Sequence, residues 1–168
     1  MLRAQAGDRE AFDQLLRLAQ EPLYRYIYSL VGTRALAEDI LQEAFILIYR
    51  KIRWLREPEL FRPWAYRIAM REAFKHLKRE RRWSDKAEDE SVLIDLPAPS
   101  RDEITPESVE QMAAQVSPAA RAVIVLHYQH EMPLAEIAEV MGVAIGTVKS
   151  RLAYGLGALR KQLTNQQT

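Results

Sequence analysis

Residues 134–152, Leu134-Ala-Glu-Ile-Ala-Glu-Val-Met-Gly-Val-Ala-Ile-Gly-Thr-Val-Lys-Ser-Arg-Leu152, have the spacing of a helix-turn-helix. Ala138 is small enough for two helices to cross there. Gly142, four residues later, can adopt the left-handed conformation that the turn needs. The pattern predicts two helices packed over a small core, whose side chains are Ile137, Met141, Val143 and Val148.

In helix-turn-helix proteins that bind DNA, the second helix lies in the major groove and its first residues face the base edges. In this sequence those residues are Thr147, Lys149, Ser150 and Arg151. A further helix over about residues 119–129 precedes the motif, because Ser117 is a suitable N-cap and Pro118 suits the first helical position. We therefore expect a small four-helix DNA-binding domain over residues 111–168.

The charge is unevenly distributed, although the chain as a whole has 24 basic and 23 acidic residues. From Arg62 to Arg82 there are eight basic residues and two acidic ones, whereas from Ser84 to Glu110 there are nine acidic residues and two basic ones. No acidic residue follows Glu139. Two basic blocks on either side of an acidic one indicate an anionic partner that is contacted at two separate places.

The acidic block also contains Pro97, Pro99 and Pro106, which is typical of a linker. We therefore expect three parts: a domain over residues 1–83, a flexible acidic linker over 84–110, and the helix-turn-helix domain over 111–168. Two interpretations of the linker remain open, a solvated spacer and a mimic of nucleic acid that keeps the basic surfaces from binding DNA too early.

The first half of the chain reads as helices, so the predicted fold class is all-α. Residues 8–31 lack glycine and have apolar residues near a 3.6-residue period, which predicts one helix, either continuous or broken at Pro22. A second amphipathic helix follows Thr33, a candidate N-cap, with Tyr49 in its apolar register. Its other face is either solvated or a docking surface for a basic partner, and it carries Glu38, Asp39, Gln42, Glu43 and Ile46.

A third helix is predicted from about Leu60 to Arg82, giving a bundle of three or four helices. At 3.6 residues per turn, aromatic residues and cations share one side of this helix, namely Trp64, Phe74, Arg67, Arg71, Lys75, Lys78 and Arg82. Cations that neutralise phosphates beside rings that stack on bases suit single-stranded or melting nucleic acid. The alternative is a wide hydrophobic face covered by arginine stems.

Several classes of function are excluded or disfavoured by composition. The chain has no cysteine, which excludes disulfides, thiolate metal sites and cysteine nucleophiles. No apolar stretch approaches the roughly 18 residues that a membrane span needs, so we expect a cytoplasmic protein.

His127, His130 and Glu131 could share one helix face as metal ligands, but two histidines without a base motif make a weak site. His76 is more typical of a packed or capping histidine. We expect no metal, no cofactor and no enzymatic activity.

Three segments in order resemble one protein family. They are Ala37-Glu-Asp-Ile-Leu-Gln-Glu-Ala-Phe45, Phe61-Arg-Pro-Trp-Ala-Tyr-Arg-Ile-Ala69 and Gly142-Val-Ala-Ile-Gly-Thr-Val-Lys-Ser-Arg-Leu152. The chain resembles the extracytoplasmic-function (ECF) group of bacterial RNA polymerase sigma factors outside the linker. The resemblance implies that the first domain binds the clamp helices of the largest polymerase subunit and opens the −10 element. It implies that the second domain binds the polymerase flap and the −35 element.

The resemblance also assigns residues to these roles. Core polymerase binding falls to Asp39, Gln42, Glu43 and Phe45. The loop from Arg53 to Arg62 is similar to the family loop that captures a flipped −10 base. The −10 contacts fall to Arg53, Arg62, Trp64, Arg67, Arg71, Lys75, Lys78 and Arg79, and the −35 contacts to Thr147, Lys149, Ser150, Arg151 and Tyr154. An anti-sigma factor is a further partner that the resemblance implies.

The sequence departs from the family pattern at two places. Arg71 and Lys75 stand where family members often have asparagine and an acid, which strengthens the attraction to phosphates. The second helix of the motif continues with Tyr154, Gly155 and Gly157 instead of arginines. Because each glycine costs a helix interior about 1 kcal/mol relative to alanine, we expect this end to fray or to admit another chain closely.

The alternative function is a helix-turn-helix regulator that binds duplex DNA without core polymerase. It explains residues 111–168 equally well, but it gives no reason for residues 37–45 or for the aromatic and basic helix.

Overall fold

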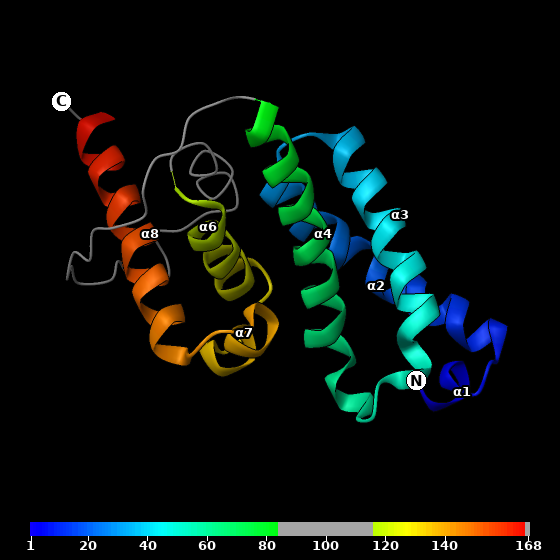
Figure 1. Cartoon of the computed structure of the whole chain (residues 1–168). Helices are drawn as coiled ribbons and strands as arrows, with labels where there is room; N and C mark the ends of the chain where they lie inside the picture. The colour runs from blue at the N-terminus through cyan, green and yellow to red at the C-terminus, as the bar shows by residue number, and fades with distance from the viewer. Residues whose placement is uncertain (84–115, 167–168) are drawn as a thin grey trace. The chain divides into compact units, whose positions relative to one another are not determined.

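The structure of the chain, a computed structural model, describes residues 1–83 and 116–166. Side chains are described over residues 1–79 and 116–158. All regular elements in the described ranges are helices, so the all-α prediction is confirmed (Figure 1). The chain divides into two compact units, Met1–Lys78 and Arg79–Thr168. The acidic linker predicted over residues 84–110 lies outside the described residues.

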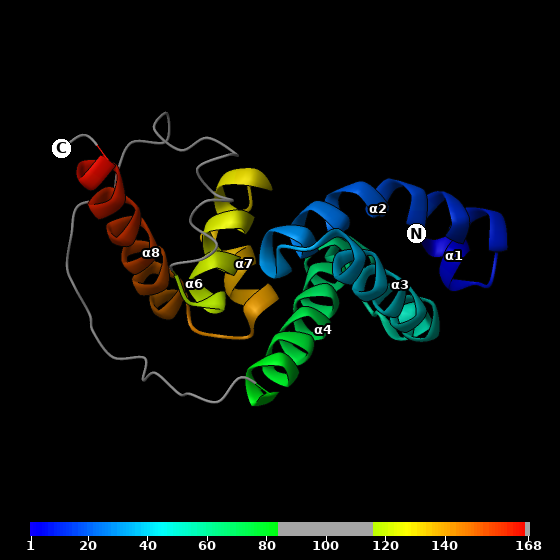
Figure 2. The ribbon, with the colours of Figure 1, turned by 90° about the horizontal axis from the view of Figure 1, so that it is seen from above.

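The first unit is a bundle in which α3 and α4 run antiparallel and α2 packs against them (Figures 1 and 2). Two short 3-10 helices, η1 and η2, connect α3 to α4. The bounds are α1 Leu2–Gln5, α2 Arg9–Val31, α3 Arg34–Lys51, η1 Ile52–Trp54, η2 Pro58–Leu60 and α4 Phe61–Trp83.

Helix α2 begins and ends where its local sequence requires. The Asp8 side chain accepts a hydrogen bond from the Ala11 amide at 3.0 Å, and Gly32 ends the helix at a left-handed φ of 75°. The helix is continuous through Pro22. Pro22 is exposed, so the backbone carbonyl that loses its in-helix donor lies on the solvent side, where water can satisfy it.

The core of this unit lies where the three long helices meet. Tyr26 of α2 contacts Tyr66 of α4, with ring centroids 5.2 Å apart. Burying such rings and branched side chains contributes roughly 1.5–3 kcal/mol each, which fixes the angle between the helices. The most deeply buried side chains from α2 and α3 are Leu23, Tyr26, Ile27, Leu30, Ile40 and Ile48.

The second unit contains the predicted helix-turn-helix. Ser117 accepts a hydrogen bond from the Ala120 amide at 3.3 Å, and Pro118 occupies the first turn, so the predicted start of the preceding helix is confirmed. This helix continues as a π-helix over Val125–Gln129. The bounds are α6 Pro118–Ile124, η4 Val125–Gln129, α7 Leu134–Met141 and α8 Ile145–Gln166.

Gly142 forms the turn as predicted. Its φ is 67°, and the amides of Gly142 and Val143 donate to the Ala138 carbonyl at 2.9 Å and 3.2 Å. The predicted core is partly wrong. Ile137 and Val148 are fully buried, but Met141 and Val143 are only half-buried. The fully buried side chain at the end of α7 is Val140.

The expected fraying after Tyr154 is not observed, because α8 continues to Gln166. Gly155 does admit a close neighbour, but the neighbour is Ile124 of α6 in the same chain. The glycine therefore brings two helices of one domain together.

Candidate polymerase and nucleic-acid interfaces

The face of α3 expected to bind core polymerase combines polar and apolar side chains. Asp39 and Gln42 are exposed. Ile46 and Tyr49, one and two turns further on, are 46% and 67% exposed. The expectation that Tyr49 is buried is therefore wrong. Its ring lies at the edge of the bundle against Phe12, with centroids 5.1 Å apart. We call Asp39, Gln42, Ile46 and Tyr49 the α3 stripe.

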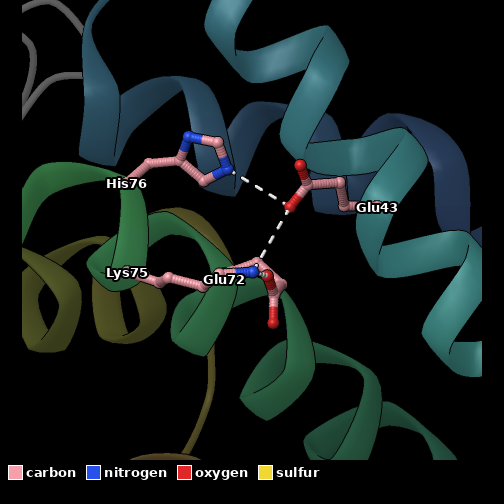
Figure 3. Close-up of polar contacts among 4 residues, drawn as sticks. All are labelled: Glu43, Glu72, Lys75 and His76. Carbon is pink, nitrogen blue, oxygen red and sulfur yellow. Dashed lines mark hydrogen bonds and ion pairs between the residues drawn. The ribbon is translucent and has the colours of Figure 1, made fainter. Parts of the chain in front are cut away.

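The other two residues expected to bind core polymerase lie beside this stripe. Glu43 and Phe45 are both half-buried. The Glu43 carboxylate contacts His76 of α4 at 3.2 Å, in a cluster that also contains Lys75 and Glu72 (Figure 3). The hydrogen bond from His76, opposed by slight burial and supported by nearby positive charge, holds the pKa of Glu43 below its usual value. The side chain of His76 is packed, as its sequence position predicts.

The predicted basic face of α4 is largely present. The side chains of Arg71, Lys75, Lys78 and Arg79 are exposed. Arg67, expected on the same face, is half-buried with its Nε atom inside the bundle. The side chain of Arg67 is therefore packed against the bundle. The exposed cations of α4 are the ones that can contact phosphates.

The two aromatic side chains expected on the basic face of α4 are only partly exposed. Trp64 is half-buried, and its ring lies 6.1 Å from that of Phe61. Phe74 is also half-buried. Intermediate burial of both side chains leaves the two interpretations of these aromatics open.

The loop before α4 carries an aromatic residue that the sequence analysis did not single out. Trp54 in η1 is 74% exposed, although tryptophan is usually largely buried. Gln5 of α1 fixes the backbone on both sides of it by donating to the Ile52 and Leu55 carbonyls at 3.0 Å and 2.6 Å. Exposed Arg53 and Arg56 flank the ring. The loop thus holds a free indole among cations in a defined position.

The residues of α8 that are predicted to read DNA differ in how exposed they are. Lys149 and Tyr154 are exposed, the latter by 43%. Thr147, Ser150 and Arg151 are half-buried, and the Ser150 hydroxyl donates to the Thr147 carbonyl at 3.0 Å. The sequence analysis missed Ile145, which is 45% exposed at the start of the helix. An exposed aliphatic side chain there is suited to the methyl group of thymine.

The remaining histidines lie in η4 (His127) and directly after it (His130). Nδ1 of His127 lies 3.0 Å from the Met132 carbonyl, and Nε2 of His130 is buried. Among the described residues, no three side chains of His, Asp or Glu are grouped so as to hold a metal ion. None of the helices in that part of the chain is long and apolar enough to cross a membrane.

Comparison with known proteins identifies both units. The family model for sigma-70 region 2 matches residues 15–83, and the model for sigma-70, region 4 matches residues 107–159. The ECF RNA polymerase sigma factor SigW of Bacillus subtilis is 32% identical to the chain, covering 94% of the chain and 91% of SigW. The RNA polymerase sigma-H factor of Pseudomonas aeruginosa is 35% identical, with coverages of 96% and 90%.

The chain belongs to the ECF sigma factors of RNA polymerase. Its region 2 domain contains the α3 stripe and the basic face of α4, and its region 4 domain contains the helix-turn-helix. Solved sigma factors share this fold. RpoE of Bartonella quintana, in complex with the anti-sigma factor NepR, superposes with a TM-score of 0.72 at 23% identity, covering 92% of this chain and 98% of that one. CnrH, in complex with the cytosolic domain of CnrY, gives 0.73 at 23% identity, with coverages of 98% and 94%.

Proposed function

We propose that this sigma factor binds core RNA polymerase through the α3 stripe, holds the melted −10 strand with α4 and the loop before it, and reads the −35 duplex with α8. The observation that carries the proposal is the pairing of a region 2 and a region 4 domain in one chain, each with exposed residues of the required chemistry. The chain would direct core polymerase to a specific set of promoters and start transcription there.

The polymerase-binding part rests on the composition of the α3 stripe. Ile46 and Tyr49 are large and exposed, and Asp39 and Gln42 place polar groups next to them on the preceding turns of α3. An apolar centre with a polar rim is the usual anatomy of a protein interface. The family resemblance supplies the partner, the clamp helices of the largest subunit, and assigns the polymerase flap to the region 4 domain. Glu43 and Phe45 lie at the edge of this surface.

The promoter-melting part rests on cations beside exposed rings. Arg53, Arg62, Arg71, Lys75, Lys78 and Arg79 supply the positive charge around the loop and along α4. Trp54 and the exposed side of Trp64 supply the stacking surfaces. Stacking on aromatic side chains stabilises single-stranded DNA by about 1–3 kcal/mol per base, and it acts only after the strands separate. Both features therefore favour the melted state. We assign Arg67 a supporting role beneath the exposed cations.

The −35 part rests on the first three turns of α8. Lys149 and Arg151 provide cations, and Thr147, Ser150 and Tyr154 provide hydrogen-bonding groups. In the free protein the Ser150 hydroxyl donates to the helix backbone, so its oxygen is left to accept a hydrogen bond from a donor group of a base.

The proposed role fixes where the chain acts and what it requires. It acts in the cytoplasm, where promoters and polymerase are found, and it involves no covalent chemistry, metal or cofactor from the chain. The solved relatives are in complex with protein partners, an anti-sigma factor in the case of RpoE. We propose that an anti-sigma factor likewise holds this chain inactive by covering its polymerase-binding and DNA-binding surfaces.

Run-off transcription with purified core polymerase on genomic promoter fragments tests the proposal. We expect transcripts that depend on the chain, their loss in Asp39→Arg, and weaker promoter opening but normal polymerase binding in Trp64→Ala. Asp13→Arg is the matched control, because it makes the same change at an exposed site of α2.

The alternative function, a regulator that acts on duplex DNA without polymerase, predicts a different result. Such a protein would shift promoter duplexes by itself and would neither bind core polymerase nor start transcripts. The region 2 match over residues 15–83 favours the sigma function.

A further inference from the structure

A polar cluster joins α3, which carries the proposed polymerase-binding surface, to α4, which carries the proposed melting surface (Figure 3). Nε2 of His76 in α4 lies 3.2 Å from Oε2 of Glu43 in α3. The Lys75 ammonium lies 3.9 Å from the same oxygen and 2.9 Å from the Glu72 carboxylate. The closest link between the two helices in this cluster is therefore the contact between the imidazole and the Glu43 carboxylate.

Burial makes the two members of this contact unequal. The His76 side chain is 16% exposed, whereas that of Glu43 is 44% exposed. The packed imidazole has a fixed position, and the carboxylate is the group that solvent or a partner can reach. The histidine thus fixes one oxygen of a carboxylate that remains partly exposed.

We propose that His76 is a positioning residue for polymerase binding: it orients the partly exposed Glu43 carboxylate beside the α3 stripe so that the carboxylate meets a cationic donor on core polymerase. This inference rests on the proposed function, because it assigns α3 to polymerase binding. Orienting a side chain before binding removes the entropy cost of immobilising it in the complex, so affinity rises without a new contact.

The same contact makes polymerase binding sensitive to pH. A neutral imidazole donates from Nε2 and leaves the full negative charge on Glu43, whereas a protonated one cancels that charge. The charged groups that face His76 are Glu43 from α3 and Glu72 and Lys75 from its own helix. Helix α2 passes behind the cluster in Figure 3, and its last turn, Tyr28–Val31, contains no charged residue. Affinity for a cationic partner therefore falls when the imidazole is protonated.

The test is the affinity of the full chain for core polymerase between pH 6 and 8.5, measured by fluorescence anisotropy. We expect His76→Phe to weaken binding at pH 8 by about five-fold, because the carboxylate loses its hydrogen-bond donor. His76→Gln retains a donor at the place of Nε2 but cannot titrate. It should bind within about two-fold of the wild type at pH 8 and lose the pH dependence between 6 and 8.

A double-mutant cycle separates positioning from a purely structural role. If His76 acts through Glu43, His76→Phe has no further effect on affinity in the Glu43→Gln background. An equal loss in both backgrounds would overturn the inference, and so would a wild-type pH profile in His76→Gln. Unfolding curves of each variant show whether the bundle is intact, and His76→Gln keeps the test valid if His76→Phe does not fold.

Failure of the inference can be told from failure of the proposed function. Asp39 lies on the α3 stripe outside this cluster, so Asp39→Arg abolishes binding whenever α3 contacts polymerase. If Asp39→Arg binds normally, the polymerase-binding role of α3 is wrong and the inference falls with it. If Asp39→Arg does not bind while the His76 variants match the wild type at every pH, only the positioning role is wrong.

Discussion

Gly155 in α8 packs directly against the side chain of Ile124 in α6, leaving no room for a Cβ atom. Ile124 is 1% exposed and Gly155 is also buried, so neither can move into solvent to relieve an overlap. From the sequence, Gly155 is a position where α8 is expected to fray. In the structure it is the position where α6 and α8 pack closely against each other in the region 4 domain.

Gly155→Ala should destabilise the region 4 domain. Overpacking of a filled core costs about 1–3 kcal/mol, which exceeds the roughly 1 kcal/mol that alanine gains over glycine in a helix. We expect faster amide hydrogen exchange in α6 and α8 and unchanged exchange in α2 and α3. Gly146→Ala is the matched control, because it lies in the same helix with no neighbouring atom within 4 Å. It should leave the domain equally stable or more stable.

Removing the Asp8 cap should make region 2 less stable in a pH-dependent way. The Ala11 amide first, and then Arg3, hold the pKa of Asp8 below its ordinary value of 3.8. A carboxyl whose pKa is lower in the folded state stabilises the fold above the unfolded-state pKa, and this contribution is lost as the pH falls through the folded-state value. Asp8→Ala should therefore lower the melting temperature near neutral pH, and the difference should shrink below pH 3.8.

Asp8→Asn separates the cap from the charge. Asparagine is also a good N-cap, so this variant should keep most of the neutral-pH stability while losing the ion pair with Arg3. Melting temperatures of Asp8→Asn as low as those of Asp8→Ala would assign the effect to the ion pair instead of the cap.

Local signals predicted most of the fold correctly. Ser117, Pro118 and Gly142 act through bonds to residues within five positions, so the sequence contains all the information that those helix ends require. The hydrophobic period is also a local pattern, and it predicted the helices α3 and α4 correctly. Tyr49 fits the period but is exposed, although Ile48 and Ile52 on either side of it are buried, because its ring lies at the edge of the bundle. A period shows which side of a helix is apolar, but it does not show how wide a strip of that side the neighbouring helices cover.

The candidate sites were predicted less completely than the fold. Motif positions located the α3 stripe, the basic face of α4 and the start of α8. They did not show that Gln5 fixes the loop around Trp54, or that His76 reaches Glu43 across 33 positions of sequence. Both contacts depend on how the helices pack. Arg67 shows the converse case, because it matches the cation pattern while the bundle buries part of its side chain.

Lys149→Ala should weaken −35 binding through the loss of one phosphate or base contact. Each phosphate that a protein neutralises contributes about −0.9 to the slope of log affinity against log salt concentration. We expect the holoenzyme to bind a −35 duplex less tightly, with a slope about one unit shallower if the contact is to phosphate. An unchanged affinity and slope would exclude Lys149 from the interface. Lys51→Ala, an exposed cation of region 2, should leave binding to this duplex unchanged.

Trp54→Ala should weaken capture of the melted −10 strand. The ring is 74% exposed, so removing it costs the free protein little packing. A lost stack is worth about 1–3 kcal/mol, which corresponds to about 5- to 150-fold weaker binding of a single-stranded −10 oligonucleotide by the holoenzyme. Trp54→Phe retains a stacking surface and should recover much of that affinity.

Two further measurements locate the effect of Trp54 at the melting step. Affinity for core polymerase and for −35 duplex should remain at the wild-type level in Trp54→Ala, because neither the α3 stripe nor α8 includes this ring. Gln5→Ala tests the support of the loop, since it removes both hydrogen bonds to the backbone around Trp54. It should weaken capture in the same direction with the ring still present. If Trp54→Ala and Gln5→Ala both bind the single strand as the wild type does, the −10 strand does not contact this loop, and Trp64 with the outer cations of α4 must hold it alone.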